Sequence, residues 1–175
     1  TILFGYFLLT EISESRLVGW ILSLVFSFSG IRLLYLGHLH SFAIQWIFLA
    51  ILSLVKLSKG KGKGWWWLLY GSFCLQFLNN FLSGYFILIS IAFWFIIFSN
   101  FRNRFLKDIK LVSVLSMLSL GITIITIWPY ISVMNQFNYI RPIRDAANFS
   151  LGLNEVWIWM LFVLMMIVLR LKKFN

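Results

Sequence analysis

The fold is most clearly indicated by the stretch WWWLLYGSFCLQFLNNFLSGYFILISIAFWFIIFSNF, Trp65–Phe101. It divides into two apolar runs, Trp65–Leu82 and Gly84–Phe101. Each run approaches the length of about 20 residues that an α-helix needs to cross the hydrocarbon of a bilayer. The runs meet at Asn79–Gly84 with almost no loop between them. The stretch therefore predicts a tight helical hairpin that crosses a membrane twice.

The composition of the whole chain favours the same class of protein. Of its 175 residues, 61% are hydrophobic and 11% are charged, and the mean hydropathy is +0.92. Soluble domains average about 45–50% apolar and about 25% charged residues. Further apolar runs occupy Thr1–Thr10, Leu17–Leu36, Phe42–Leu57, Leu111–Val133 and Val156–Leu171.

None of the runs alternates with period two, which argues against a transmembrane barrel. Backbone groups in lipid must be paired within the segment, so each run is predicted to be a helix. We expect an all-α fold: one polytopic transmembrane bundle over residues 1–175, with about six full crossings. The first run is half the length of a crossing, so it is counted as truncated and the chain is interpreted as a fragment.

The distribution of basic residues predicts the topology. The net charge is +10, but the basic residues form short clusters between apolar runs, a pattern typical of cytoplasmic loops and not of a nucleic-acid-binding surface. If every run crosses once, twelve of the 15 basic residues share one side. Only Arg32, Arg141 and Arg144 remain for the other. The twelve are Arg16, Lys56, Lys59, Lys61, Lys63, Arg102, Arg104, Lys107, Lys110, Arg170, Lys172 and Lys173.

This bias predicts a multi-pass protein of the plasma (inner) membrane with its basic loops in the cytoplasm. Ser58–Trp67 is then a solvated cytoplasmic loop ending in tryptophans at the headgroup layer, or a contact for anionic lipids.

His38 and His40 would point about 200° apart on a helix and adjoin no Cys, Asp or Glu, so no metal site is predicted. Cys74 is expected to be a buried, inert thiol.

The polar segment NQFNYIRPIRDAANFS, Asn135–Ser150, is predicted to lie on the extracytoplasmic side, within an interfacial loop or short helix over residues 132–155. Pro129 can kink or end the preceding helix, and Pro142 biases Arg141 away from helical geometry. Arg141 and Arg144 could hold a phosphate, or they could form surface salt bridges with Asp145 and Glu155.

Two other polar patches are predicted on that side, and each allows two interpretations. Arg32 either extends to the interface as a snorkelling side chain or binds an anion through its forked donors. Gln76 and Asn80 share a helix face because they are four residues apart. They either hydrogen-bond between helices or line a cavity that binds sugar hydroxyls.

Three stretches, in this order and spacing, resemble a known family. They are RLLYLGHLHSFAIQWIFLAIL (Arg32–Leu52), LQFLNNFLSGYFILI (Leu75–Ile89) and WPYISVMNQFNYIRPIRDAANFS (Trp128–Ser150). The third combines a Pro-Tyr helix end, Arg141 four residues before Asp145, and Ser150 five residues later. The chain resembles the GT-C type of polytopic membrane glycosyltransferase, which uses polyprenyl-phosphate-linked sugars and includes mannosyltransferase-like members.

The resemblance implies inverting transfer of a sugar from a polyprenyl-phosphate donor to an acceptor on the extracytoplasmic face, with that donor as the substrate and no further cofactor. Arg141 would be the principal phosphate ligand, supported by Arg144 and Arg32. The residues expected to line the cavity are His38, His40, Gln45, Asn80, Tyr139 and Asp145. The family's catalytic carboxylate lies in a first outer loop near the N-terminus. Glu11 and Glu14 are predicted to be cytoplasmic, so no catalytic residue is assigned and the fragment alone is expected to be inactive.

Two other functions are compatible with the composition. The chain could be a non-catalytic structural subunit of a larger membrane complex, whose partners would be membrane lipids and other subunits. It could also be a transporter or channel. The latter is disfavoured because the apolar runs carry almost no ionisable groups at mid-depth, where ion pathways need them.

Overall fold

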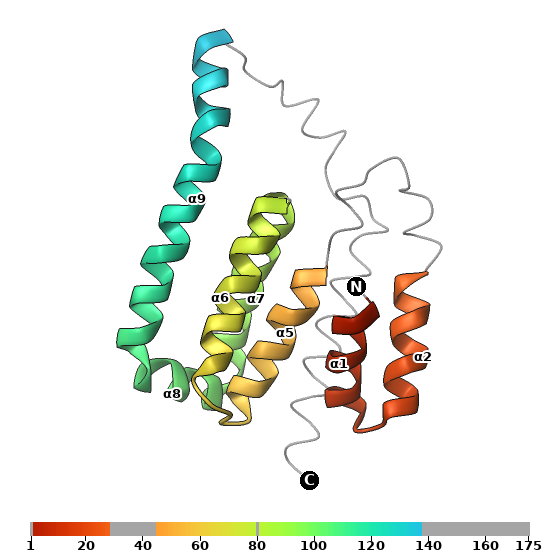
Figure 1. Ribbon diagram of the computed structural model, residues 1–175. Helices are drawn as coiled ribbons and strands as arrows, with labels where there is room; N and C mark the ends of the chain where they lie inside the picture. Colours follow the sequence, from red (N-terminus) through yellow and green to blue (C-terminus); the bar gives the residue numbers. More distant parts are fainter. Residues whose placement is uncertain (1, 29–44, 80, 138–175) are drawn as a thin grey trace. The chain divides into compact units, whose positions relative to one another are not determined.

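The computed structural model describes residues 2–28, 45–79 and 81–137, and every regular element within these ranges is an α-helix (Figure 1). The all-α prediction is therefore confirmed for this part of the chain. The helix α9 begins in a first compact unit, residues 1–126, and ends in a second, residues 127–175. The helices are α1 (Ile2–Ser13), α2 (Arg16–Ser27), α5 (Gln45–Ser58), α6 (Gly64–Asn79), α7 (Phe81–Ile97), α8 (Ser99–Lys107) and α9 (Ile109–Phe137).

Helices α1 and α2 form a tight antiparallel pair (Figure 1). Ser15 caps α2, because its side-chain oxygen accepts a hydrogen bond from the backbone N–H of Val18 at 3.4 Å. The two helices approach closely at Gly19, where a Cβ would lie 3.0 Å from the backbone nitrogen of Thr10. The second predicted run extends beyond residue 28, and that remainder lies outside the described residues.

Helices α6 and α7 form the hairpin that the sequence predicts at Asn79–Gly84. Helix α6 ends at Asn79, α7 begins at Phe81, and the two lie side by side (Figure 1). Helix α5 packs against both of them and against α1. The buried side chains at the centre of this packing include Leu54 and Leu57 of α5, Trp66, Leu69 and Phe77 of α6, and Ile87 and Trp94 of α7.

The closest approach within this hairpin is at Gly84, where a Cβ would lie 3.1 Å from the Cα of Phe77. Gly84→Ala is expected to lower the free energy of unfolding by about 1–3 kcal/mol, because the added methyl group would push the two backbones apart. Gly71→Ala is the matched control. No atom lies within 4 Å of its Cβ position, and alanine favours a helix over glycine by about 1 kcal/mol. Equal unfolding midpoints of the two variants in detergent micelles would contradict the close contact.

The fifth predicted run, Gly84–Phe101, is predicted to be one continuous helix, and the structure corrects the position at which that helix ends. The helix breaks at Phe98, whose backbone is extended (φ −104°, ψ 102°), and α8 then turns 105° away from residues 84–97 of α7. The reason is a change in side-chain pattern. Residues 99–107 are amphipathic, with Phe101 buried on one face and charged residues on the other.

Pro129 does not end the sixth helix, because α9 runs through it to Phe137. A proline inside a helix removes one backbone hydrogen bond, but long apolar helices of the membrane type tolerate that loss. The first residues of the predicted loop 132–155 are thus helical, and those after 137 lie outside the described part. Among the described helices, α9 is the one long and apolar enough to cross a membrane by itself.

The remaining apolar helices, α1, α2 and α5, are shorter, and α7 with α8 would count as a span only if the bent pair is taken together. Successive helices alternate in direction within the first unit: α1, α5 and α7 run toward the end that carries α8, whereas α2, α6 and the start of α9 run away from it (Figure 1). The alternation places the α1–α2 turn, the α5–α6 connection and α8 at one end of this unit, and the α6–α7 turn at the other (Figure 1).

Candidate functional site at the charged end

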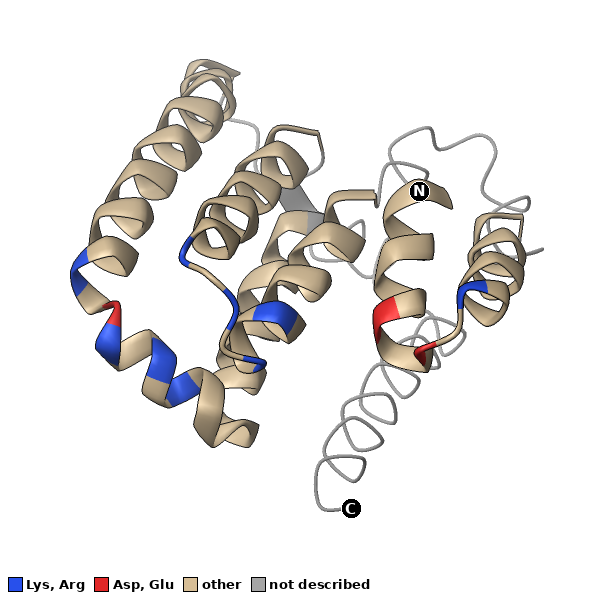
Figure 2. Ribbon diagram, turned by 60° about the horizontal axis from the view of Figure 1, so that its bottom comes forward, with Lys and Arg blue, Asp and Glu red and all other residues tan. Residues whose placement is uncertain are grey.

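All charged residues in the described part of the chain lie at one end of the first unit, which we call the charged end (Figure 2). They belong to the α1–α2 turn, the α5–α6 connection, and α8 with the start of α9. The structure thus places together the described members of the basic clusters that the sequence analysis assigned to one side. The charged residues at this end, acidic and basic together, are Glu11, Glu14, Arg16, Lys56, Lys59, Lys61, Lys63, Arg102, Arg104, Lys107, Asp108 and Lys110.

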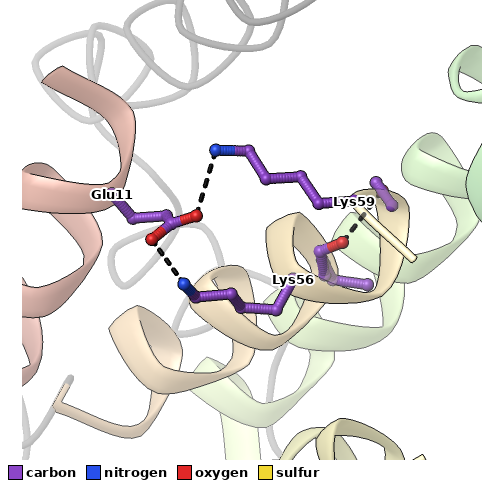
Figure 3. Close-up of polar contacts among 5 residues, drawn as sticks. Glu11, Lys56 and Lys59 are labelled. Carbon is purple, nitrogen blue, oxygen red and sulfur yellow. Dashed lines mark hydrogen bonds and ion pairs between the residues drawn. The ribbon is translucent and has the colours of Figure 1, made fainter. Parts of the chain in front are cut away.

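The first cluster at the charged end joins α1 to α5. The carboxylate of Glu11 accepts a hydrogen bond from Lys56 on one oxygen and from Lys59, at 3.0 Å, on the other (Figure 3). Lys56 lies in the last turn of α5, and Lys59 directly follows the end of that helix at Ser58. The ammonium group of Lys56 also lies 5.9 Å from the ring centre of Trp65. These contacts tie two helices whose residues are more than 40 positions apart in the sequence.

The second cluster is centred on Asp108, at the turn between α8 and α9. Its side chain is only 2% exposed. Its carboxylate accepts a hydrogen bond from the indole N–H of Trp66 at 3.0 Å and forms an ion pair with Nε of Arg104 at 2.7 Å. The ammonium group of Lys63 lies 3.6 Å from the other oxygen. The cluster therefore joins the start of α6 to the corner between α8 and α9.

The ionisation of Asp108 reflects two opposed effects. Burial raises its pKa, because the charged form loses its hydration. The hydrogen bond from Trp66 and the positive charges of Arg104 and Lys63 lower the pKa by more, so it lies below the ordinary value for an aspartic acid. Asp108 is consequently a fixed anion at neutral pH.

The chemistry available at the charged end is the binding of anions. A general base must be free to take up a proton, whereas Glu11 and Asp108 are held by cations. Within the described ranges no group of three His, Cys, Asp or Glu could hold a metal ion. Arg16, Lys61, Arg102, Lys107 and Lys110 have no acidic partner among the described residues. The end therefore carries an excess of uncompensated positive charge.

Neither the cluster around Glu11 nor the cluster around Asp108 was predicted from the sequence. The spacing of four residues between Arg104 and Asp108 was a usable signal, because residues four apart on a helix can pair. No comparable signal exists for Glu11, whose partners are distant in sequence. Their pairing depends on the packing of α1 against α5.

Most residues of the predicted outer site lie outside the described residues: Arg32, His38, His40, Asn80, Tyr139, Arg141, Arg144 and Asp145. Gln45 is described. It begins α5, at the end of that helix remote from Lys56. Gln76 is fully buried in α6. Comparison of the chain with protein-family models, curated proteins and solved structures gives no significant match. The resemblance to GT-C glycosyltransferases stays a prediction.

Proposed function

We propose that the chain is the membrane-embedded helical part of a GT-C-type glycosyltransferase, with about six crossings, which transfers a sugar from a polyprenyl-phosphate donor on the extracytoplasmic face. One observation supports this topology. The described helices alternate in direction, and all the described charged residues lie at one end of them (Figures 1 and 2). An excess of lysine and arginine on one side is typical of the cytoplasmic face of multi-pass proteins.

The charged end then faces the cytoplasm and leaves the opposite end for the lipid-linked donor. Gln45 begins α5 at that opposite end. The hairpin between α6 and α7 turns there as well. The assignment to glycosyl transfer is supported by the three stretches that resemble the family, two of which, around Gln45 and around this hairpin, contribute residues to that end.

The proposed reaction is a displacement at the anomeric carbon of the sugar. An acceptor hydroxyl attacks that carbon, the bond from carbon to the phosphate oxygen breaks, and the polyprenyl phosphate leaves with the bonding electron pair. The proton of the hydroxyl passes to a carboxylate base. Arg141, with Arg144 and Arg32, would hold the departing phosphate. The described carboxylates Glu11, Glu14 and Asp108 lie at the charged end, so none of them is proposed as the base.

Arg141→Ala tests this function most simply. In the full-length protein reconstituted in liposomes, transfer from a polyprenyl-phosphate-linked sugar should fall at least about tenfold, because the departing phosphate loses a charged donor. Arg16→Ala is the matched control, since Arg16 lies at the charged end and should leave transfer unchanged. Undiminished transfer by the Arg141 variant would remove the role proposed for that residue.

A second candidate function is that of a non-catalytic subunit in a membrane complex. The observation that favours it is the location of all three described carboxylates at the charged end, away from the proposed donor site. A full-length protein that transfers no sugar but purifies with a partner over its outer face would favour this function over the first.

A further inference from the structure

We propose that the corner between α8 and α9 binds the headgroups of anionic phospholipids in the inner leaflet. The corner consists of Lys63, Arg102, Leu106, Lys107 and Lys110, arranged around Asp108. The proposal rests on the membrane topology proposed above and is independent of the transferase activity.

The corner carries positive charge that the described residues do not neutralise. Asp108 is the one acidic residue described there, and it is already engaged by Trp66 and Arg104. Lys63 makes only the longer contact of 3.6 Å, and its side chain is 68% exposed. Arg102, Lys107 and Lys110 are exposed as well. An anion that approaches this surface therefore meets Arg102, Lys107 and Lys110, which have no acidic partner among the described residues.

The orientation of α8 fits the surface of a bilayer. The helix turns 105° from α7, so it would lie along the interface if α7 crosses the membrane. Phe101 fixes this orientation, because its ring packs 5.5 Å from that of Trp66 and is fully buried. Burial of that face leaves Arg102, Leu106 and Lys107 on the exposed side of α8. The protein itself covers the apolar face of α8, and the exposed cations of the helix stay available to lipid phosphates.

The apolar residues within the corner favour a lipid over a soluble anion or an acidic protein. Leu106 is 57% exposed between the cations of α8, and Ile109 is 43% exposed at the start of α9. A free phosphate would gain nothing from these side chains. A phospholipid offers a phosphate to the cations and the upper part of its acyl chains to the apolar groups. A bound phospholipid would therefore contact both the basic and the apolar side chains exposed at the corner.

The experiment is native mass spectrometry of the full chain released from nanodiscs that contain equal parts of phosphatidylglycerol and phosphatidylcholine. The wild-type protein should retain phosphatidylglycerol in preference. The triple variant Arg102→Gln/Lys107→Gln/Lys110→Gln should retain at least about tenfold less of it, because each basic residue near an anionic surface contributes about fivefold in affinity.

Two further variants control for charge and for fold. Arg16→Gln removes one cation from the charged end outside the corner and should retain phosphatidylglycerol like the wild type. Arg102→Lys/Lys107→Arg/Lys110→Arg keeps the charge and should also retain it. Equal retention by the wild type and the triple glutamine variant would overturn the proposal. So would equal retention of the two lipids, or binding of polyglutamate without phosphatidylglycerol, which would assign the corner to an acidic protein.

Failure of this proposal can be distinguished from failure of the proposed function. Release of the wild-type chain from membranes by alkaline carbonate would contradict the membrane topology itself. A carbonate-resistant protein that shows no preference for phosphatidylglycerol would overturn only the lipid site.

Discussion

Trp66→Ala is expected to lower the free energy of unfolding by about 3–5 kcal/mol, the range found when a large buried aromatic side chain is truncated. Trp66 is fully buried. Its ring lies 5.5 Å from that of Phe101 and 5.9 Å from that of Phe105, and its N–H binds Asp108. The substitution would therefore leave a cavity beneath α8 and an aspartate without one of its donors.

The neighbouring residue provides a matched control. Trp67 is 57% exposed, so Trp67→Ala should change the stability by no more than about 0.5 kcal/mol. Trp66→Phe keeps most of the ring but removes the N–H, and it should cost about 1–3 kcal/mol because the buried carboxylate of Asp108 loses one of its donors. Circular dichroism during denaturant unfolding in micelles measures all three. If Trp66→Ala and Trp67→Ala unfold at the same midpoint, the packing described for this corner is wrong.

Asp108→Asn should cost about 3 kcal/mol, because it leaves the guanidinium of Arg104 largely buried without its counter-ion. Asparagine can still accept the hydrogen bond from Trp66, so this variant isolates the contribution of charge. The double variant Arg104→Gln/Asp108→Asn should recover part of the loss, since neither charge then remains unpaired. Strictly additive losses in this cycle would show that the two side chains do not interact.

The same ion pair predicts a dependence of stability on pH. The pKa of Asp108 is lower in the folded protein than in the unfolded chain, so its contribution is complete above the ordinary pKa of about 3.9. The contribution is lost as the pH falls through the lowered pKa. Between about pH 5 and pH 3 the wild type should lose more stability than Asp108→Asn. Parallel losses in the two proteins would assign the acid sensitivity to other groups.

The sequence predicted those features that depend on composition along the chain. Two apolar runs meet at Asn79–Gly84. The polar segment between them is too short to separate the two helices, so they form a hairpin there. The described basic clusters meet at one end because successive described helices alternate in direction (Figures 1 and 2). Both features depend on hydropathy and charge, which can be read residue by residue.

Features that depend on tertiary packing could not be predicted in the same way. The turn at Phe98 lies inside an apolar run. The amphipathic pattern of residues 99–107 marks a change there, but the contact between Phe101 and Trp66, which holds α8 at an angle to α7, depends on tertiary packing. Glu11 finds Lys56 and Lys59 because α1 packs on α5, a contact between distant segments. Pro129 is accommodated within α9, although the residue type alone favoured a helix end.

In the proposed topology the charged end is cytoplasmic and the segment around Ser150 is extracytoplasmic. Single cysteines test it directly in a Cys74→Ser background: Lys61→Cys and Lys107→Cys at the charged end, and Ser150→Cys in the predicted outer segment. A membrane-impermeant maleimide should label the Ser150→Cys protein in intact cells. It should label the other two only after the inner membrane is permeabilised. Labelling of Lys61→Cys or Lys107→Cys in intact cells, or protection of Ser150→Cys until permeabilisation, would contradict the topology and with it the proposed function.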